Sequence, residues 1–374
     1  MTNFRARHYV TNQPVEVSIR NSVIESVTPI ADEPNLPWIA PTFCDVQING
    51  CLGFDFGSPQ LTIEQVRTVA DECRRHGIGR LCPTIITGGF DAVRHGFTTL
   101  AAACDSDPDL NFRLPKFHLE GPYLSGEDGP RGAHPREHIR DPNWDEFQRW
   151  QEAAGGRIGM VTVAPERTGA IAFIEKLASA EIVVAIGHTA ATAEQLRDAI
   201  RAGAKTSTHL GNGCQAVLPR HPNIIWEQLA ADELWASIIC DGHHLSGSIV
   251  KSIVRGKTIA RTLITCDASS LAGLPPGRYT HWSTELDVLP GGKVVVPGTP
   301  YLAGSGVFTD VCVSTVIQQA GVSLQDAVDM AAIRPRELMG LPVPRIEVGQ
   351  QPAEVMLFDW QQGHELTVRE VISL

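Results

Sequence analysis

The middle of the chain alternates short apolar segments with longer amphipathic ones. Eight apolar segments have the length and composition of buried strands, at positions 42–48, 80–86, 116–120, 159–164, 182–188, 205–210, 235–241 and 262–267. Segments with helix-like patterns lie at 62–76, 141–154, 168–180, 192–202, 307–320 and 323–333, and the predicted N-caps of the first four are Thr62, Asp141, Thr168 and Thr192. Buried strands alternating with helices indicate a parallel sheet wrapped by helices. Because a closed barrel of this kind has eight strands, we predict an α/β fold, the (β/α)8 TIM-type barrel.

Both ends of the chain alternate apolar and polar residues, which is the pattern of strands with one face exposed to solvent. Segments 15–19 and 23–27 flank a turn at 20–21, and segments 353–358 and 365–371 flank a turn at 361–364. Because neither end supplies enough strands to enclose a core, we predict one small β-sandwich domain formed from both termini. The predicted boundaries are 1–41 with 346–374 for this domain and 42–345 for the barrel. The Gly- and Pro-rich segment 271–300 is predicted to be a loop or hairpin insert.

Composition narrows the class of protein. The 374 residues fit one barrel with a small accessory domain, and 43% hydrophobic with 20% charged residues is typical of a soluble globular protein. A net charge of -11 argues against nucleic acid or an anionic membrane as a partner, since both require clustered Lys and Arg. The N-terminus lacks the apolar core of a signal peptide. The nine cysteines are scattered without a Cys-x-x-Cys pair, so we expect buried small hydrophobes in a reducing compartment and a cytoplasmic protein.

Polar residues stand at the C-terminal ends of the predicted strands, which is the end where barrel enzymes assemble their active sites. They are Gln47, Asn49, Glu120, His188, His209, Asp241 with His244, and Asp267. Glu120, His188 and His209 supply three ligands on one rim, the number that leaves a catalytic metal an open position for water. Taken singly, Glu120 could pair with an arginine and each histidine could be structural. His118 either contacts a metal ligand or fills the barrel interior.

The ligand types indicate which metal would bind and how many. Two imidazoles and one carboxylate suit zinc best, with iron or manganese as alternatives. Gln47 and Asn49 occupy the place where many barrel hydrolases carry His-x-His, and neutral amides are poor ligands for a transition metal. We therefore predict one divalent metal per chain. Opposite three ligands, Asp267 is predicted to be the general base that takes a proton from water and delivers it to the leaving nitrogen, although an N-cap or turn Asp is its alternative role.

Several motifs together resemble the N-acetylglucosamine-6-phosphate deacetylases of the amidohydrolase superfamily. They lie at 45–51, 118–124, 132–134, 187–192, 208–212, 241–244, 267–268 and 302–305, so their order and spacing cover nearly the whole chain. The resemblance implies that the acetamide of N-acetylglucosamine 6-phosphate is hydrolysed to glucosamine 6-phosphate and acetate. It makes Glu120, His188 and His209 the metal ligands and Asp267 the catalytic acid/base.

The resemblance also implies a set of residues around the substrate. These are Ala133, His134, Asn212, Gly213, Arg220, His244, Leu302, Ala303 and Gly304. His134 is expected to polarise the acetyl carbonyl oxygen, so it is counted with Asp267 as catalytic. In the family, the arginine matching Arg220 comes from the neighbouring subunit and meets the phosphate, which implies a homodimer.

One departure from the family pattern leaves the substrate open. The family continues the sixth-strand motif with Asn-Ala-Met, whereas this chain has Asn212, Gly213 and Cys214. A deacetylase acting on a related N-acyl amino sugar is therefore an alternative. A non-catalytic barrel that binds a sugar phosphate and a barrel hydrolase acting on a different amide are further alternatives; the retained Asp267 argues against the first of these two.

Overall fold

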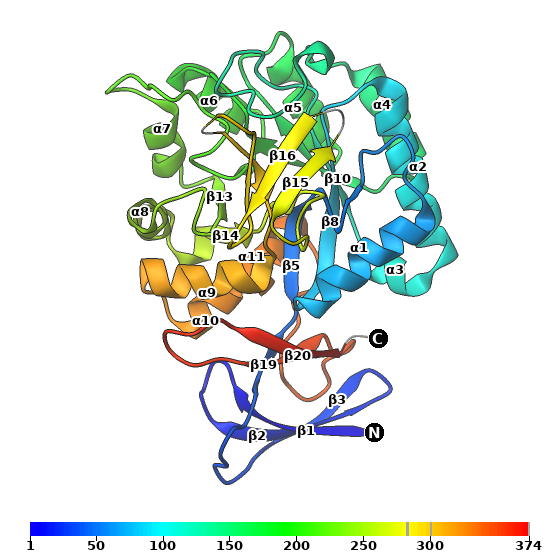
Figure 1. Ribbon diagram of the computed structural model, residues 1–374, viewed down its shortest axis with the longest axis vertical. Coiled ribbons are helices and arrows are strands. Elements are labelled where there is room, and N and C mark those ends of the chain that lie inside the picture. Colours follow the sequence, from blue (N-terminus) through cyan, green and yellow to red (C-terminus); the bar gives the residue numbers. More distant parts are fainter. Residues whose placement is uncertain (282–283, 300, 373–374) are drawn as a thin grey trace.

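The central unit is an eight-stranded parallel barrel, described in a computed structural model that covers residues 1–281, 284–299 and 301–372. The sheet order is β14-β13-β12-β11-β10-β9-β8-β5, and an isolated parallel bridge between Ile48 and Ala268 joins its first and last strands (Figure 1). The strands are β5 (Phe43–Ile48), β8 (Ile78–Ile86), β9 (Phe117–Glu120), β10 (Ile158–Val163), β11 (Val183–Ile186), β12 (Thr206–Ser207), β13 (Trp235–Ile239) and β14 (Thr262–Thr265). Each coincides with one predicted segment, so the predicted barrel is confirmed.

Helices cover the outside of the barrel. They are α1 (Ile63–Arg75), α2 (Phe90–Ser106), α3 (Pro108–Arg113), α4 (Trp144–Ala153), α5 (Ala170–Ser179), α6 (Ala193–Arg201), α7 (Ile224–Ala230), α8 (Gly247–Lys257), α9 (Thr309–Ala320), α10 (Leu324–Ala332) and α11 (Arg334–Met339), with 3-10 turns η1 (Arg136–His138) and η2 (Ile259–Arg261). The predicted N-caps Thr62 and Thr192 are confirmed, because each hydroxyl accepts the N–H three residues later within a capping box.

Two predicted N-caps are wrong. Helix α4 is capped by Asn143, and Gly169, in the left-handed conformation, precedes α5. The reason lies in a contact between distant segments: the Asp141 carboxylate accepts the backbone N–H of Thr168 at 3.2 Å and pairs with the Arg167 guanidinium at 2.8 Å. Both residues are therefore engaged with each other's loop and not with a helix end.

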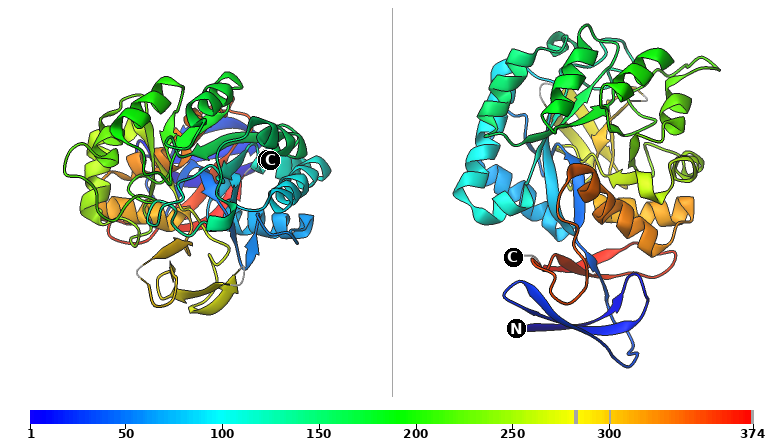
Figure 2. Two further views of the ribbon diagram at one scale, coloured as in Figure 1. Left: turned by 90° about the horizontal axis from the view of Figure 1, so that it is seen from above. Right: turned by 180° about the vertical axis from the view of Figure 1, so that it is seen from behind.

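Both ends of the chain build one β unit below the barrel (Figure 1). Its sheet order is β20-β19-β4-β1-β2-β3, with bounds β1 (Thr2–His8), β2 (Pro14–Arg20), β3 (Val23–Pro29), β4 (Trp38–Pro41), β19 (Val355–Asp359) and β20 (Thr367–Ile372). The β19–β20 hairpin lies between the barrel and β1–β3, and the view from behind in Figure 2 agrees. Apolar side chains from both ends, such as Val17, Ile24 and Leu357, form its core. The unit expected from both termini is thus present, while its exact boundaries stay a prediction; positions 373–374 lie outside the described residues.

The Gly- and Pro-rich insert forms antiparallel strands. They are β15 (Gly277–His281), β16 (Thr284–Leu289), β17 (Lys293–Val295) and β18 (Leu302–Ser305), and positions 282, 283 and 300 lie outside the described residues. A short hairpin of β6 (Gly50–Cys51) and β7 (Phe54–Asp55) follows β5. The insert has its own apolar cluster around Leu271, Leu286 and Val288 and projects from the barrel in Figure 2. Its last strand returns to the barrel, since the Ser305 N–H donates to the Asp267 carbonyl at 2.9 Å.

A buried charged cluster joins the terminal sheet to the bottom of the barrel. The Glu354 carboxylate accepts from Nε and Nη2 of Arg80, both at 2.9 Å, and from Nη2 of Arg336 at 3.2 Å. Arg336 also donates to the Thr42 hydroxyl at 3.0 Å, and all four residues are buried. The two guanidinium groups neutralise the buried carboxylate, and Arg336 also donates to the carbonyls of Thr42 and Ala332.

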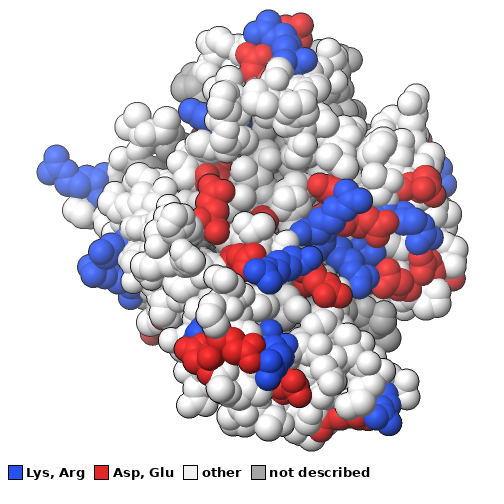
Figure 3. Space-filling view, turned by 60° about the horizontal axis from the view of Figure 1, so that its bottom comes forward, with Lys and Arg blue, Asp and Glu red and all other residues white. Residues whose placement is uncertain are grey.

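The surface is of mixed charge. On the face shown in Figure 3, Lys and Arg side chains lie among Asp and Glu side chains. Exposed ion pairs such as Arg5–Glu33 contribute little stability each, because water and salt screen them. The nine cysteines are free, and all but Cys214 are buried, as predicted. Within the described residues, no helix is long and apolar enough to cross a membrane.

Candidate metal centre and active site

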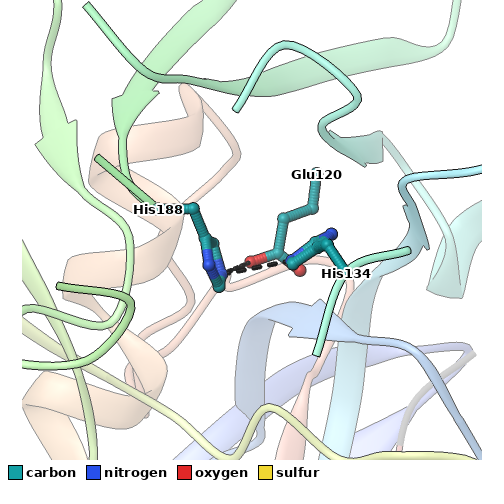
Figure 4. A group of neighbouring side chains, drawn as sticks. All are labelled: Glu120, His134 and His188. Atoms are coloured by element: carbon teal, nitrogen blue, oxygen red, sulfur yellow. Dashed lines mark hydrogen bonds and ion pairs between the residues drawn. The ribbon is translucent and has the colours of Figure 1, made fainter. Parts of the chain in front are cut away.

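Four side chains converge at the C-terminal end of the barrel. Glu120 ends β9, His188 and His209 each stand two residues after β11 and β12, and His134 comes from the loop that follows β9. Glu120 Oε1 lies 3.2 Å from Nε2 of His188 and 3.2 Å from Nε2 of His209, and these two nitrogens are 3.0 Å apart. Nε2 of His134 lies 3.2 Å from Nε2 of His188 (Figure 4). The structure thus brings the three predicted ligands and His134 together.

The orientation of His188 is fixed by its surroundings. Its backbone has a φ of 50°, and Nδ1 lies 2.8 Å from the carbonyl of Pro130, which can only accept. Nδ1 therefore carries the hydrogen, and the Nε2 lone pair faces Glu120. Two glycines from different loops flank the ring: a Cβ on Gly132 would lie 3.2 Å from Cε1, and one on Gly213 would lie 2.9 Å from Nδ1. A side chain at position 213 would require the ring or its loop to shift, and one at position 132 would make an unusually tight contact with the ring.

The donor atoms fit a divalent metal. Ligand atoms about 2.05 Å from a tetrahedral zinc lie about 3.3 Å from one another, close to the distances among Glu120 Oε1 and the two histidine nitrogens. Among the described residues, no Lys or Arg pairs with the buried Glu120 carboxylate. A buried anion facing imidazole nitrogens is stabilised by a metal cation. One oxygen or nitrogen each from Glu120, His134 and His188 also lies within 4.8 Å of the others.

The two amides predicted to replace metal ligands bind the carboxylates. Nε2 of Gln47 donates to Glu120 Oε1 at 2.9 Å, and Nδ2 of Asn49 donates to Asp267 Oδ1 at 2.8 Å. Burial and the nearby Glu120 carboxylate raise the pKa of Asp267 to about 7. An Asp whose pKa lies near neutrality suits both acceptance and donation of a proton. The amides therefore orient the two acids of the site.

Some predicted substrate residues lie around this centre. The Asn212 N–H donates to the His209 carbonyl at 2.9 Å, and the Gly213 carbonyl accepts from the Thr189 N–H at 3.2 Å. Leu302, Ala303 and Gly304 lie on β18, and Gly304 is beside Asp267, since a Cβ on Gly304 would lie 3.2 Å from the Asp267 carbonyl oxygen. Ala133, next to buried His134, is exposed.

The two residues predicted to meet a phosphate differ in setting. Nδ1 of His244 lies 2.7 Å from Oδ2 of Asp241, at the end of β13. Burial raises the pKa of Asp241, but this hydrogen bond lowers it to about 2. The Asp241 carboxylate therefore accepts from Nδ1–H of His244, which leaves Nε2 of His244 for a ligand. Arg220 is exposed on the loop before α7, where its guanidinium makes no hydrogen bond or ion pair with the part of the chain that the structure describes. The single chain does not bring Arg220 to the centre.

His118 belongs to the barrel interior. Its Nε2 lies 2.8 Å from the Thr162 hydroxyl, whose oxygen lies 2.8 Å from that of Thr208. Burial lowers the pKa of His118 to about 4, so the ring is neutral at pH 7. Of the two roles considered, filling the interior is the one observed.

Sequence reasoning assigned no role to three residues that hold the site. Asp45 binds the chain just before Asp267, Pro130 orients His188, and Glu166 accepts from the Ala190 N–H at 2.8 Å and from the Thr189 hydroxyl at 2.5 Å. Only Asp45 carried a sequence signal that could have found it, since it is a carboxylate within the apolar segment of β5, two residues before Gln47.

Comparisons with known proteins agree with this geometry. No protein-family model matches the chain. It is 33% identical over 343 residues to N-acetylglucosamine-6-phosphate deacetylase of Danio rerio, covering 89% of this chain and 82% of that relative. It is 28% identical to N-acetylgalactosamine-6-phosphate deacetylase of Escherichia coli O157:H7, covering 90% and 89%. A mutant of N-acetyl-D-glucosamine-6-phosphate deacetylase from Mycobacterium smegmatis, in complex with N-acetyl-D-glucosamine-6-phosphate, superposes with a TM-score of 0.86 at 27% identity, covering 100% and 98%.

The barrel with its buried carboxylate and imidazoles at the C-terminal end defines an amidohydrolase. The 33% identity to a deacetylase over 343 residues narrows this class to one family of amidohydrolases. The chain belongs to the N-acetylglucosamine-6-phosphate deacetylase family and is an amide hydrolase.

Proposed function

We propose that this enzyme hydrolyses the acetamide of N-acetylglucosamine 6-phosphate to glucosamine 6-phosphate and acetate. The observation that carries the proposal is the convergence of Glu120, His188 and His209 opposite Asp267, in a chain similar over most of its length to deacetylases of this sugar phosphate. We propose that zinc is held by the first three residues, one ion per chain, with iron or manganese as alternatives. When bound, the metal supplies a Lewis acid that activates water and polarises the acetyl carbonyl.

Asp267 is the proposed proton shuttle. Its Oδ1 is occupied by the Asn49 amide, which leaves Oδ2 to accept a proton from the water that attacks the carbonyl carbon. Asp267 then delivers this proton to the sugar nitrogen as the C–N bond breaks, so that the amine leaves neutral. A pKa raised by burial favours the second half of this cycle.

His134 is the proposed partner of the acetyl oxygen. Burial lowers the pKa of His134 to about 3, so its ring is neutral at pH 7. Nδ1 lies 2.9 Å from the Thr87 hydroxyl; when that hydroxyl donates, Nε2 carries the hydrogen and points toward Nε2 of His188. In this tautomer His134 donates to the carbonyl oxygen, where negative charge develops during attack.

The substrate test is acetate release by metal-loaded enzyme from four sugars: N-acetylglucosamine and N-acetylgalactosamine, each with and without the 6-phosphate. The proposal expects the highest kcat/KM for N-acetylglucosamine 6-phosphate and about one metal per active chain by elemental analysis. A preference for the galactosamine phosphate would favour the second candidate, a related amino-sugar deacetylase. That candidate is supported by Gly213 and Cys214 in place of the family's usual pair and by similarity to a deacetylase of that sugar phosphate.

We also propose that the enzyme is a homodimer in which Arg220 binds the phosphate held by the partner chain. The loop carrying Arg220 projects from the barrel before α7 (Figure 1). Near it, Val217 is 86% exposed and Trp226 is 57% exposed, which is apolar surface that a second copy would bury. A guanidinium offers the paired donors that a phosphate dianion requires.

Replacing Arg220 by Met is expected to raise KM for the phosphorylated sugar by roughly 10- to 150-fold, the worth of a hydrogen bond to a charged group. The unphosphorylated sugar should be affected far less. Mixing Arg220→Met chains with Asp267→Asn chains should restore activity, because a mixed dimer contains one site with an intact Asp267 and a partner's intact Arg220. No recovery in mixed dimers verified by mass spectrometry would show that Arg220 does not act across the interface.

A further inference from the structure

A second carboxylate lies beneath the active site, wholly buried. Oδ1 of Asp45 accepts from the Gln47 N–H at 3.0 Å and the Thr265 hydroxyl at 2.5 Å, and Oδ2 accepts from the Cys266 N–H at 2.8 Å and the Thr309 hydroxyl at 2.7 Å. Four donors match the lone pairs of one carboxylate, which makes a buried anion tolerable without a cation. Two of these donors belong to the two residues that directly precede Asp267.

The residue that follows those donors is held in an unusual conformation. Asp267 has a φ of 49°, in the left-handed region, which costs backbone energy in a residue with a side chain. Fixed contacts on both sides keep it there: the Cys266 N–H is bound by Asp45, and the Asp267 carbonyl accepts from the Ser305 N–H at 2.9 Å. The direction of the Asp267 carboxylate therefore depends on where Asp45 holds the preceding peptide.

A short stretch of chain makes the contacts that set both acids of the centre. Asp45 and Gln47 lie on β5, Asn49 directly follows it, and the pairing of β5 with β8 is irregular between Asp45 and Ile48. Gln47 donates to the Glu120 carboxylate, Asn49 donates to the Asp267 carboxylate, and Asp45 accepts from the peptide before Asp267. Asp267 is thus held at its side chain by Asn49 and at the preceding peptide by Asp45.

We propose that Asp45 is a positioning residue for the hydrolysis, acting through Asp267. It binds neither metal nor substrate; it fixes the backbone from which the proton shuttle projects. The inference rests on the proposed role of Asp267. A displacement of the carboxylate by a fraction of an ångström weakens proton transfer, because a general base works only within hydrogen-bond reach.

A purely structural role must be separated from this one. Asp45 lies on β5 and Thr265 on β14, the two strands that meet where the barrel closes, so loss of their contact also removes stability. A matched control exists at the other end of the barrel. Thr42, like Thr265, is fully buried and its hydroxyl makes a hydrogen bond to a charged side chain, there accepting from Arg336.

The test compares Thr265→Val, Thr265→Ser and Thr42→Val. Both valine variants should lose thermal stability. Thr265→Val should lower kcat at least about 10-fold with KM within about threefold, since a misplaced group slows the chemical step more than binding. Thr265→Ser, which restores the hydroxyl, should recover kcat, and Thr42→Val should keep kcat within about twofold. Equal kcat in Thr265→Val and Thr42→Val would overturn the proposal.

A double-mutant cycle adds a second readout. Asp45→Asn should lower kcat in the wild-type background while metal content is retained, but should cause no further loss once Asp267 is Asn, because both changes remove the same function. Additive losses would show that Asp45 does not act through Asp267. If Asp45→Asn does not fold, the threonine variants decide. Failure of the wild-type enzyme to release acetate would count against the proposed function, whereas normal turnover by Thr265→Val would count only against the role of Asp45.

Discussion

The barrel has a buried carboxylate at each end, and the two are stabilised differently. At the bottom, Glu354 receives three hydrogen bonds from the guanidinium groups of Arg80 and Arg336. At the top, Glu120 is met by the nitrogens of His188 and His209 and by the Gln47 amide. The first cluster has its positive charge built into the sequence, whereas the second supplies lone pairs and needs a cation. Equal burial of a carboxylate therefore accompanies a cluster with its own cations in one case and the proposed metal site in the other.

Replacing each of the two buried glutamates, Glu120 and Glu354, by glutamine should distinguish the two ends of the barrel most clearly. Glu120→Gln is expected to lose the metal and to lower acetate release about 1,000-fold, equivalent to several kcal/mol of lost Lewis-acid catalysis. Glu354→Gln is expected to keep the metal in folded chains but to destabilise the fold by about 3–5 kcal/mol, because it leaves buried arginines uncompensated. Elemental analysis and urea unfolding measure the two effects. Metal loss of similar size in both variants would contradict the distinction.

Asp267→Asn should separate the ligands from the proton shuttle within the upper cluster. The change keeps the shape and the contact with Asn49 can rearrange, but the basic oxygen is gone. We expect kcat to fall at least about 100-fold while metal content and KM stay close to wild type. Steady-state kinetics with metal analysis tests this. Loss of the metal would instead identify Asp267 as a ligand.

The stability of metal-free protein should depend on pH through Asp267. Its pKa is raised to about 7 in the folded chain, against about 3.9 for an unfolded Asp. Between these values the folded state binds more protons than the unfolded state, so stability falls as pH rises from about 4 to 7. From pH 5 to pH 8, chelator-treated Asp267→Asn should gain on the order of 2 kcal/mol relative to wild type. Both proteins must be compared because His134 and His118 titrate in the opposite sense. If the difference in stability between the two proteins stayed the same from pH 5 to pH 8, the prediction would be refuted.

The smallest expected effect concerns the loop that covers His188. Gly213→Ala restores the residue usual in the family, yet its Cβ would lie 2.9 Å from Nδ1 of His188. We expect the metal dissociation constant to rise about 10-fold, as for other changes beside a ligand. Gly340→Ala is the control, since its φ of 65° imposes a comparable backbone strain with no atom within 4 Å of the new Cβ. Competition with a chromophoric chelator measures both. Equal affinities in the two variants would show that the contact with His188 is unimportant.

The sequence was sufficient for the barrel strands because most are short, largely apolar segments with polar residues toward one end, although segment 205–210 is mostly polar. Helix α2 was not predicted, since Gly96 and Thr99 interrupt its apolar stripe; Gly96 instead lets the helix approach Phe56 and Ile85 closely. The N-caps at Asp141 and Thr168 were wrong for a related reason, as a contact between two loops engages both. The local sequence pattern carries no information about contacts between distant segments.

The residues of the candidate site also fall into two groups: those that a local sequence pattern predicts and those whose contacts join distant segments. Glu120, His188 and His209 could be predicted because each ends a strand and the barrel brings strand ends together. The hydrogen bond from His188 to Pro130 could not, because the partner lies in a loop whose path depends on the packing of the whole rim. Arg220 could not be placed from the structure of one chain, because its guanidinium makes no hydrogen bond or ion pair with the described residues and the role proposed for it depends on a partner chain.

The cluster around Glu354 also bears on how the polypeptide is made. A ribosome delivers Arg80 long before Glu354, from which it is separated by 274 positions. Strands β1 and β4 likewise are synthesised well before β19, the strand that pairs with β4 on its other side. The lower end of the nascent barrel therefore keeps two arginines without their counter-ion until translation has passed position 354. Completion of this end of the barrel therefore waits until Glu354 has been made, and contacts between residues this far apart in the sequence form slowly.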